Sequence, residues 1–205
     1  MLPLTNMRDI SGWVVSLPLT NMRDRKDWVV SVVPVLFLSG DIFFEGASIM
    51  QMITSGFYVL KDQFFTDMND PFLKNNKDGN RPFYYCIKGE KEDKNIYWMI
   101  PLSHKIEKYR KIIEDKVQAN KPCDGLYIAK LPSGTESAFL IQDIFPITDN
   151  YIERTYTLGG NHLILPYEDD IDIISQKAKK VLSLIKRGIK LTPTSPNVMA
   201  IYDKL

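Results

Sequence analysis

The chain has 205 residues, with 26 basic and 25 acidic side chains and a formal net charge of +1. Its two cysteines and two histidines show neither CxxC nor HExxH spacing, which excludes a disulfide framework and a typical zinc site. No glycine-rich phosphate loop of the GxxxxGK[ST] or GxGxxG kind occurs. We therefore expect a cytoplasmic protein that needs no metal or cofactor.

A tandem repeat opens the chain, because Leu2–Ser16 recurs as Leu17–Ser31. The copies differ only at Ile10/Arg25, Ser11/Lys26 and Gly12/Asp27. Repeat proteins usually keep core positions, vary exposed ones and stack at least three copies. This near-identity in two copies instead indicates constraint on the nucleotide sequence, and a recent in-frame duplication is the alternative.

The segment before Met50 has features of a leader sequence. Codons for Glu45-Gly46-Ala47 can contain a bacterial ribosome-binding sequence at a working distance from Met50. We therefore interpret residues 1–49 as translated upstream sequence, or as disordered. Residues 50–205 are then a single domain that starts at Met50 or Met52.

A signal peptide is the competing interpretation of the same segment. The basic stretch Arg23–Lys26 precedes the apolar run Trp28–Leu38, but it lies far from Met1, and Pro34 interrupts the run. The run is also too short to span a bilayer. We expect no membrane association.

Five strands are predicted from runs of aromatic and β-branched residues bounded by turns. They cover Gly56–Leu60, Pro82–Lys88, Ile96–Leu102, Leu126–Leu131 and Ala138–Gln142. Pro132-Ser133-Gly134 predicts a hairpin between the last pair. The segment Phe64–Gly79 is predicted to be an irregular loop.

Apolar residues at helical spacing predict helices over His104–Ala119 and Asp169–Arg187. Ile106, Tyr109, Ile113 and Val117 form the apolar face of the first helix. Strands with interspersed helices but without regular alternation predict an α+β fold on a compact, partly closed sheet.

The junction between the third strand and the first helix is the strongest candidate site. Amide groups at a helix N-terminus bind phosphate, and Ser103, His104 and Lys105 would add a hydroxyl, a proton-transfer group and a charge. The alternative is that Ser103 simply caps the helix. Arg81 reaches the same phosphate if its strand neighbours that of Ser103, and otherwise is a solvated turn residue.

Basic residues beyond this junction would extend a phosphate-binding surface. Asn80 lies beside Arg81, and Lys108, Arg110 and Lys111 follow on the helix, where they would track backbone phosphates. The aromatic candidates for stacking on nucleic-acid bases are Phe65, Phe72 and Tyr84, and core packing is the commoner role of such residues. His162, after Gly159-Gly160, is interpreted as a turn histidine rather than a second acid or base.

Short sequence motifs that follow one another in a particular order carry a family resemblance. They are Phe57–Val59, Asp70-Pro71, Asn80–Phe83 and Tyr97–Ser103. Over Phe57–Leu205, the chain resembles ToxN/AbiQ-like endoribonuclease toxins of type III toxin–antitoxin systems, and more closely their CptN-like branch. The resemblance implies a small, partly closed antiparallel β-barrel of the PemK/MazF kind with added amphipathic helices.

The same resemblance implies site residues. The family's basic active-site residue matches Arg81, and its pair of hydroxyl residues matches Ser103 and His104, of which the second departs from the pattern. A family lysine is approximated by Lys105, one position out of register. An active-site tyrosine of the family corresponds to Phe64, so that role is unsupported in this chain.

The implied activity is sequence-specific, metal-independent RNA cleavage that gives a 2′,3′-cyclic phosphate, with a role in phage defence by abortive infection. The implied partners are substrate RNA and a pseudoknot-like RNA antitoxin of tandem repeats encoded upstream, in an oligomeric protein–RNA complex. Leu2–Ser31 is then the antitoxin repeat read as protein. The alternatives are a non-catalytic barrel that binds RNA or protein, and a type II toxin with a protein antitoxin.

Overall fold

The computed structural model describes residues 51–77, 79 and 81–205. The expectations for residues 1–49, for the start at Met50 and for Asn80 fall outside these residues. All statements below concern the described part of the chain.

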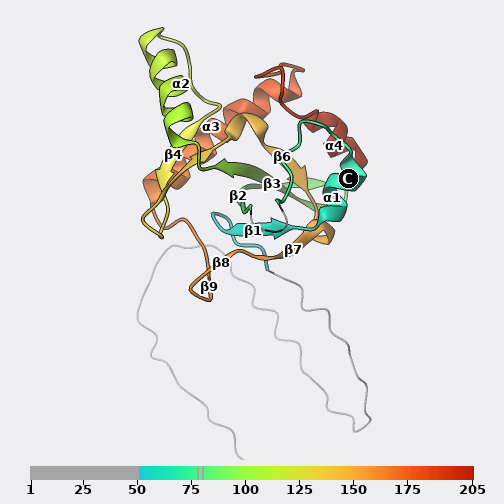
Figure 1. Cartoon of the computed structure of the whole chain (residues 1–205). Helices are drawn as coiled ribbons and strands as arrows, with labels where there is room; N and C mark the ends of the chain where they lie inside the picture. Colours follow the sequence, from blue (N-terminus) through green and yellow to red (C-terminus); the bar gives the residue numbers. More distant parts are fainter. Residues whose placement is uncertain (1–50, 78, 80) are drawn as a thin grey trace, which may run out of the picture. The chain divides into compact units, whose positions relative to one another are not determined.

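An antiparallel seven-stranded sheet forms the centre of the described structure (Figure 1). Its strands are β1 (Phe57–Leu60), β2 (Phe83–Lys91), β3 (Lys94–Ser103), β4 (Tyr127–Lys130), β5 (Glu136–Phe139), β6 (Phe145–Ile147) and β7 (Ile152–Thr155). The strand order is β4-β5-β3-β2-β1-β7, and β6 also pairs with β3. A separate two-stranded ribbon joins β8 (Thr157–Leu158) to β9 (Asn161–His162).

The α+β prediction is confirmed, whereas the described sheet is not closed into a barrel. The order ends at β4 on one side and at β7 on the other, so these two strands remain edges. Closure requires the outermost strands to pair with each other. Here β4 pairs with β5 and β7 with β1. The expectation of a partly closed barrel is therefore replaced by an open sheet.

The hairpin of β2 and β3 is the longest pairing in the sheet. Its register runs from Lys91↔Lys94 at the turn to Phe83↔Pro101 at the open end, with a shift between Tyr85 and Ile87. Such a bulge adds twist, which curves the strands around the core. The hairpin brings the chain before Phe83 next to the chain after Pro101.

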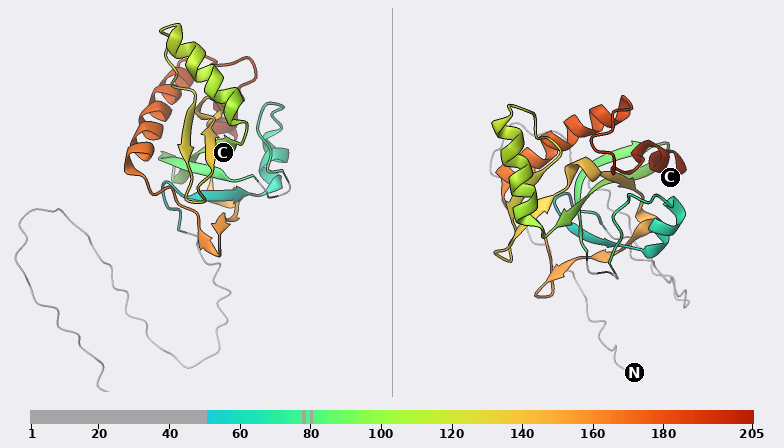
Figure 2. Two further views of the ribbon diagram at one scale, coloured as in Figure 1. Left: turned by 60° about the vertical axis from the view of Figure 1, so that its left-hand side comes forward. Right: turned by 45° about the horizontal axis from the view of Figure 1, so that its top comes forward.

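Helices α2 (Ile106–Gln118) and α3 (Glu168–Lys186) confirm the two predicted helices. The structure adds α1 (Asp62–Met68) and α4 (Val198–Lys204). The prediction of an irregular loop from Phe64 is therefore wrong at its start. Phe64 and Met68 are buried one turn apart, and a pattern this short is not distinctive in sequence. Figure 2 shows α1 beside α4, away from α2.

Two apolar clusters hold these elements. The main core is built on aromatic rings of β1, β2 and β3. Phe57 of β1 and Tyr84 of β2 also meet Phe139 of β5, and the centroids of these three rings are 5.1–6.3 Å apart. A smaller cluster lies under the first turns of α2. Val117, which we expected on the buried face, is 64% exposed because the last turn of α2 extends past this cluster.

Candidate functional site

Arg81 and Ser103 lie at the same end of neighbouring strands. The β2–β3 register pairs Phe83 with Pro101. Arg81 lies two residues before Phe83, and Ser103 lies two residues after Pro101. Both side chains are half-buried. The sequence prediction for Arg81 required that these two strands be neighbours. The structure meets this condition.

The chain turns from β3 into α2 immediately after Ser103. The Ser103 hydroxyl accepts a hydrogen bond from the backbone N–H of Lys105, at 3.3 Å. The helix begins at Ile106, later than predicted, and the residue at its N-cap position, Lys105, makes no side-chain capping bond. The N–H of Ile106 donates to the carbonyl oxygen of His104 at 2.9 Å, so the amides that follow it in the first turn are the ones left for an anion. His104 and Lys105 are exposed beside them.

Arg81 is held by the backbone that precedes it. Its N–H donates to the carbonyl oxygen of Asn76 at 3.0 Å, and its Nη1 donates to that of Asn75 at 3.0 Å. Partial burial lowers the pKa of the guanidinium from its usual value, and nearby Tyr109 on α2 opposes that shift. Arginine stays charged at neutral pH in any such setting, so the site keeps a positive charge.

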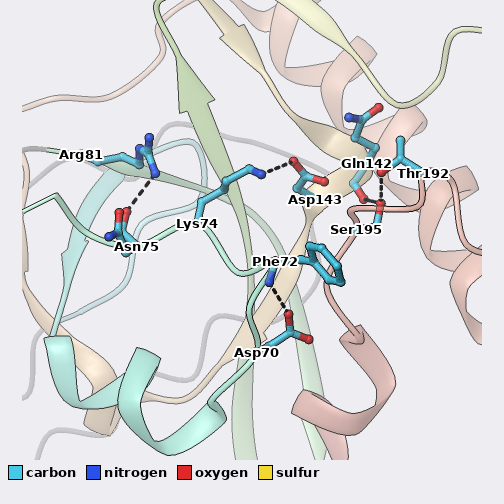
Figure 3. A network of polar contacts seen from close by, with 9 residues as sticks. All are labelled: Asp70, Phe72, Lys74, Asn75, Arg81, Gln142, Asp143, Thr192 and Ser195. Carbon is cyan, nitrogen blue, oxygen red and sulfur yellow. Dashed lines mark hydrogen bonds and ion pairs between the residues drawn. The ribbon is translucent and has the colours of Figure 1, made fainter.

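Sequence reasoning missed an ion pair close to Arg81. Lys74 Nζ lies 3.8 Å from Asp143 Oδ2, and Asp143 is only 4% exposed. Figure 3 shows Lys74 reaching toward Asp143 from the segment that also carries Asn75. Burial raises the pKa of Asp143 to about 6, while Lys74 opposes the shift. In the sequence, the available sign of a buried ion pair was the single carboxylate of Asp143 within the apolar run Leu140–Ile147.

The basic residues of α2 differ in what they contact. Arg110 Nη2 forms an ion pair with Oε2 of Glu136 on β5, at 2.8 Å. Lys108 Nζ lies 5.6 Å from the centroid of the Tyr109 ring, and Lys111 is exposed. Lys108 and Lys111 are thus more available to an RNA backbone than Arg110, whose charge is already paired.

Aromatic residues and His162 are placed mainly by packing. Tyr84 is 1% exposed, and Phe65 packs on the core, whereas Phe72 is 39% exposed and free to meet a ligand. Phe64 is fully buried. His162 lies in the short strand β9, and its Nε2 lies 3.1 Å from the carbonyl oxygen of Phe57, so its ring has a structural contact.

A cavity of about 630 Å³ among the described residues lies at the opposite end of β3 from Ser103. Its lining includes Lys94, Asn95, Thr148 and Lys204, and none of the candidate site residues. At the candidate site itself, Arg81 and Ser103 are half-buried, and His104 and Lys105 are exposed.

The described residues contain no group of three His, Cys, Asp or Glu side chains placed to hold a metal ion. No helix among them is long and apolar enough to cross a membrane. Comparison with models of known protein families and with curated proteins gives no match to this chain.

Proposed function

We propose that this protein is a sequence-specific, metal-independent endoribonuclease toxin of a type III toxin–antitoxin system. The observation that carries the proposal is the pairing of β2 with β3, which puts Arg81 and Ser103 at one end of the sheet. Helix α2 begins shortly after Ser103, so Arg81, Ser103 and the start of α2 belong to the same end of the sheet, which supports a phosphate site there.

Such a surface suits cleavage of an RNA phosphodiester by its own 2′-hydroxyl. The 2′-oxygen attacks phosphorus, the bond from phosphorus to the 5′-oxygen breaks, and a 2′,3′-cyclic phosphate and a 5′-hydroxyl form. RNA supplies the nucleophile, so the protein has to orient the phosphate, stabilise charge and move protons.

Each candidate residue has a role in this reaction. Arg81 and the α2 amides stabilise the negative charge that develops on the phosphorane oxygens. Ser103 orients the phosphate through its hydroxyl. His104 or Lys105, both exposed at the helix start, takes the proton from the 2′-hydroxyl or returns one to the 5′-oxygen.

The partners follow from the same proposal. Substrate RNA lies along the exposed face of α2, and a repeat RNA antitoxin covers the same surface in an oligomeric protein–RNA complex in the cytoplasm. The kinship with PemK/MazF barrels belongs to the proposal as well. In this chain the corresponding sheet is open, so a loop, a helix or the bound RNA has to cover the exposed edges.

Replacing Arg81 and Ser103 by alanine tests the proposal. Incubation of purified protein with RNA in the presence of a chelator should give fragments ending in a 2′,3′-cyclic phosphate. We expect each substitution to lower the cleavage rate by about 100-fold or more, as removal of one donor to a developing oxyanion does. Lys88→Ala, an exposed residue in the middle of β2, is the matched control and should cleave at the normal rate.

The result also separates the rival functions. Cleavage that is equally fast in both alanine variants would mean that the proposed site is wrong. RNA binding without cleavage by the unaltered chain would favour a non-catalytic RNA-binding protein. Tandem short repeats in the upstream DNA favour an RNA antitoxin, whereas a short reading frame there favours a type II system.

A further inference from the structure

The segment Asp70–Asn76, which we call the anchored segment, is tied to the rest of the fold by side chains at both ends. At its start, Asp70 Oδ2 accepts a hydrogen bond from the backbone N–H of Asn197 at 2.7 Å. At its end, Asn76 is 1% exposed, and its Nδ2 donates to the carbonyl oxygen of Leu60 at 2.5 Å. The middle of the segment is held by the contact of Lys74 with Asp143.

Asp143 is a rigid point of attachment. It ends the 3₁₀ turn Ile141–Asp143, its own N–H donates to the carbonyl oxygen of Leu140 at 2.9 Å, and both Ile141 and Ile144 are fully buried. A buried carboxylate is costly unless a counter-charge or hydrogen bonds compensate it. Its ion-pair partner, Lys74, comes from the anchored segment.

A continuous set of contacts joins Asp143 to Arg81. Lys74 is bound to Asp143, Asn75 follows it directly, and the Asn75 carbonyl accepts the hydrogen bond from Arg81 Nη1. Figure 3 shows Lys74 between Asp143 and Asn75, and Arg81 on the other side of Asn75. The direction of that carbonyl, and so of the guanidinium, depends on where Lys74 is held.

We propose that Asp143 is a positioning residue, which acts through Lys74 to fix the Asn75 carbonyl and thereby the direction of the Arg81 guanidinium. Its consequence for RNA cleavage rests on the proposed function, because only there does Arg81 contact the phosphate. Burial raises the pKa of Asp143, which means that its charged form is costly in the folded protein. A costly buried charge fits a role in a local contact better than a role in stability.

The alternative is that Asp70 and Asn76 suffice to hold the segment and that the Lys74–Asp143 contact is incidental. The variants Lys74→Met, Asp143→Asn and their combination decide between these, because a residue that acts only through another adds nothing once that other is removed. Lys74→Met changes a partly exposed side chain, so one informative variant folds even if Asp143→Asn does not.

The first measurement is the ¹⁵N resonance of the Arg81 side chain in the full chain, assigned by its loss in Arg81→Lys. In both single variants it should move toward the position of a freely rotating arginine. The matched control is Lys180→Met, which removes the ion pair between Lys180 Nζ on α3 and Asp124 Oδ1, 3.4 Å apart. This variant should leave the Arg81 resonance in place. An unchanged Arg81 resonance in Lys74→Met or in folded Asp143→Asn overturns the proposal.

The second measurement is RNA cleavage. Each single variant should lower kcat on the order of 10- to 100-fold with KM changed little, and the double variant should be no slower than the slower single one. Losses that multiply in the double variant overturn action through Lys74. Cleavage that is insensitive to Arg81→Ala contradicts the proposed function instead, and the resonance then decides the positioning proposal alone.

Discussion

The ring of Phe64 stacks on that of Phe145, with centroids 5.4 Å apart and planes 25° from parallel. Phe65 and Tyr151 meet the Phe64 ring edge-on, and Phe64 has no exposed surface. The family resemblance aligns an active-site tyrosine with this position. In this chain the position belongs to the core of the sheet, where a hydroxyl group would have no access to RNA.

Substitutions at Phe64 should therefore act on stability. Phe64→Ala should lower the free energy of unfolding by about 3–5 kcal/mol, and Phe64→Tyr by about 1–3 kcal/mol because its hydroxyl is buried without a partner. Urea denaturation measures both, and Phe72→Ala, at an exposed ring, should cost little. Faster RNA cleavage by Phe64→Tyr at unchanged stability would contradict this assignment.

Stability should depend on pH through Asp143. Burial raises its pKa from the usual 3.8 to about 6, so the folded state binds this proton more tightly than the unfolded state does. The stabilisation is complete below the unfolded pKa and is lost as the pH rises through about 6. From pH 7 to pH 5, the unaltered protein should gain about 1 kcal/mol relative to Asp143→Asn.

Urea denaturation of both proteins at the two pH values isolates this contribution, since all other groups titrate alike in the pair. Equal changes in both proteins would mean that Asp143 titrates near its normal pKa. Lys74 opposes the rise in the pKa of Asp143.

The basic face of α2 should determine the salt dependence of RNA binding. Each phosphate contact to single-stranded RNA contributes about 0.7 to the slope of log K against log salt concentration. In a Ser103→Ala background, which should not cleave, Lys108→Ala and Lys111→Ala should each reduce the slope by about that amount. Arg110→Ala should reduce it less, because Arg110 is paired with Glu136.

Filter binding or fluorescence anisotropy over a series of salt concentrations gives these slopes. Lys88→Ala serves again as the control, since Lys88 lies on β2 away from α2. Equal slopes for all of these variants would show that RNA binds elsewhere.

Lysines of the β2–β3 hairpin should stabilise the end of α4. Lys94 Nζ donates to the carbonyl oxygen of Leu205 at 2.6 Å, and Lys91 Nζ donates to that of Tyr202 at 2.8 Å. Carbonyl groups at a helix C-terminus lack backbone partners and favour a positive charge. Lys94→Met should lower the free energy of unfolding by about 1–2 kcal/mol, whereas Lys88→Met should not, as measured by thermal unfolding.

A chain that begins at Met50 should fold and cleave RNA like the full chain. Met52 packs against the main core, and residues from Phe57 onward form both apolar clusters of the described part of the chain. Thermal unfolding and the cleavage rate of the two chains provide the comparison. Loss of activity on this truncation would contradict the interpretation of residues 1–49 as translated antitoxin repeat and leader.

Much of the sheet could be predicted from local sequence, since side chains of one strand alternate between core and solvent or are all buried. Two aromatic runs predicted the strands β2 and β3, whereas their pairing, which makes Arg81 and Ser103 neighbours, was left open until the structure showed it. The elements β6, β7, α1 and α4 were missed. These segments of three to seven residues lack the runs of aromatic and β-branched residues that marked the equally short β1, β4 and β5, and they depend on long-range contacts.

The sequence by itself determined the α+β class, the strands β2 and β3 and the residue types at the start of α2, because these depend on neighbours along the chain. Tertiary structure alone decided that the sheet stays open, that Phe64 is core and that Asp143 holds Lys74. Those outcomes depend on which distant segments pack together. A buried charge is tolerated where the fold supplies its partner, and no local pattern specifies that partner.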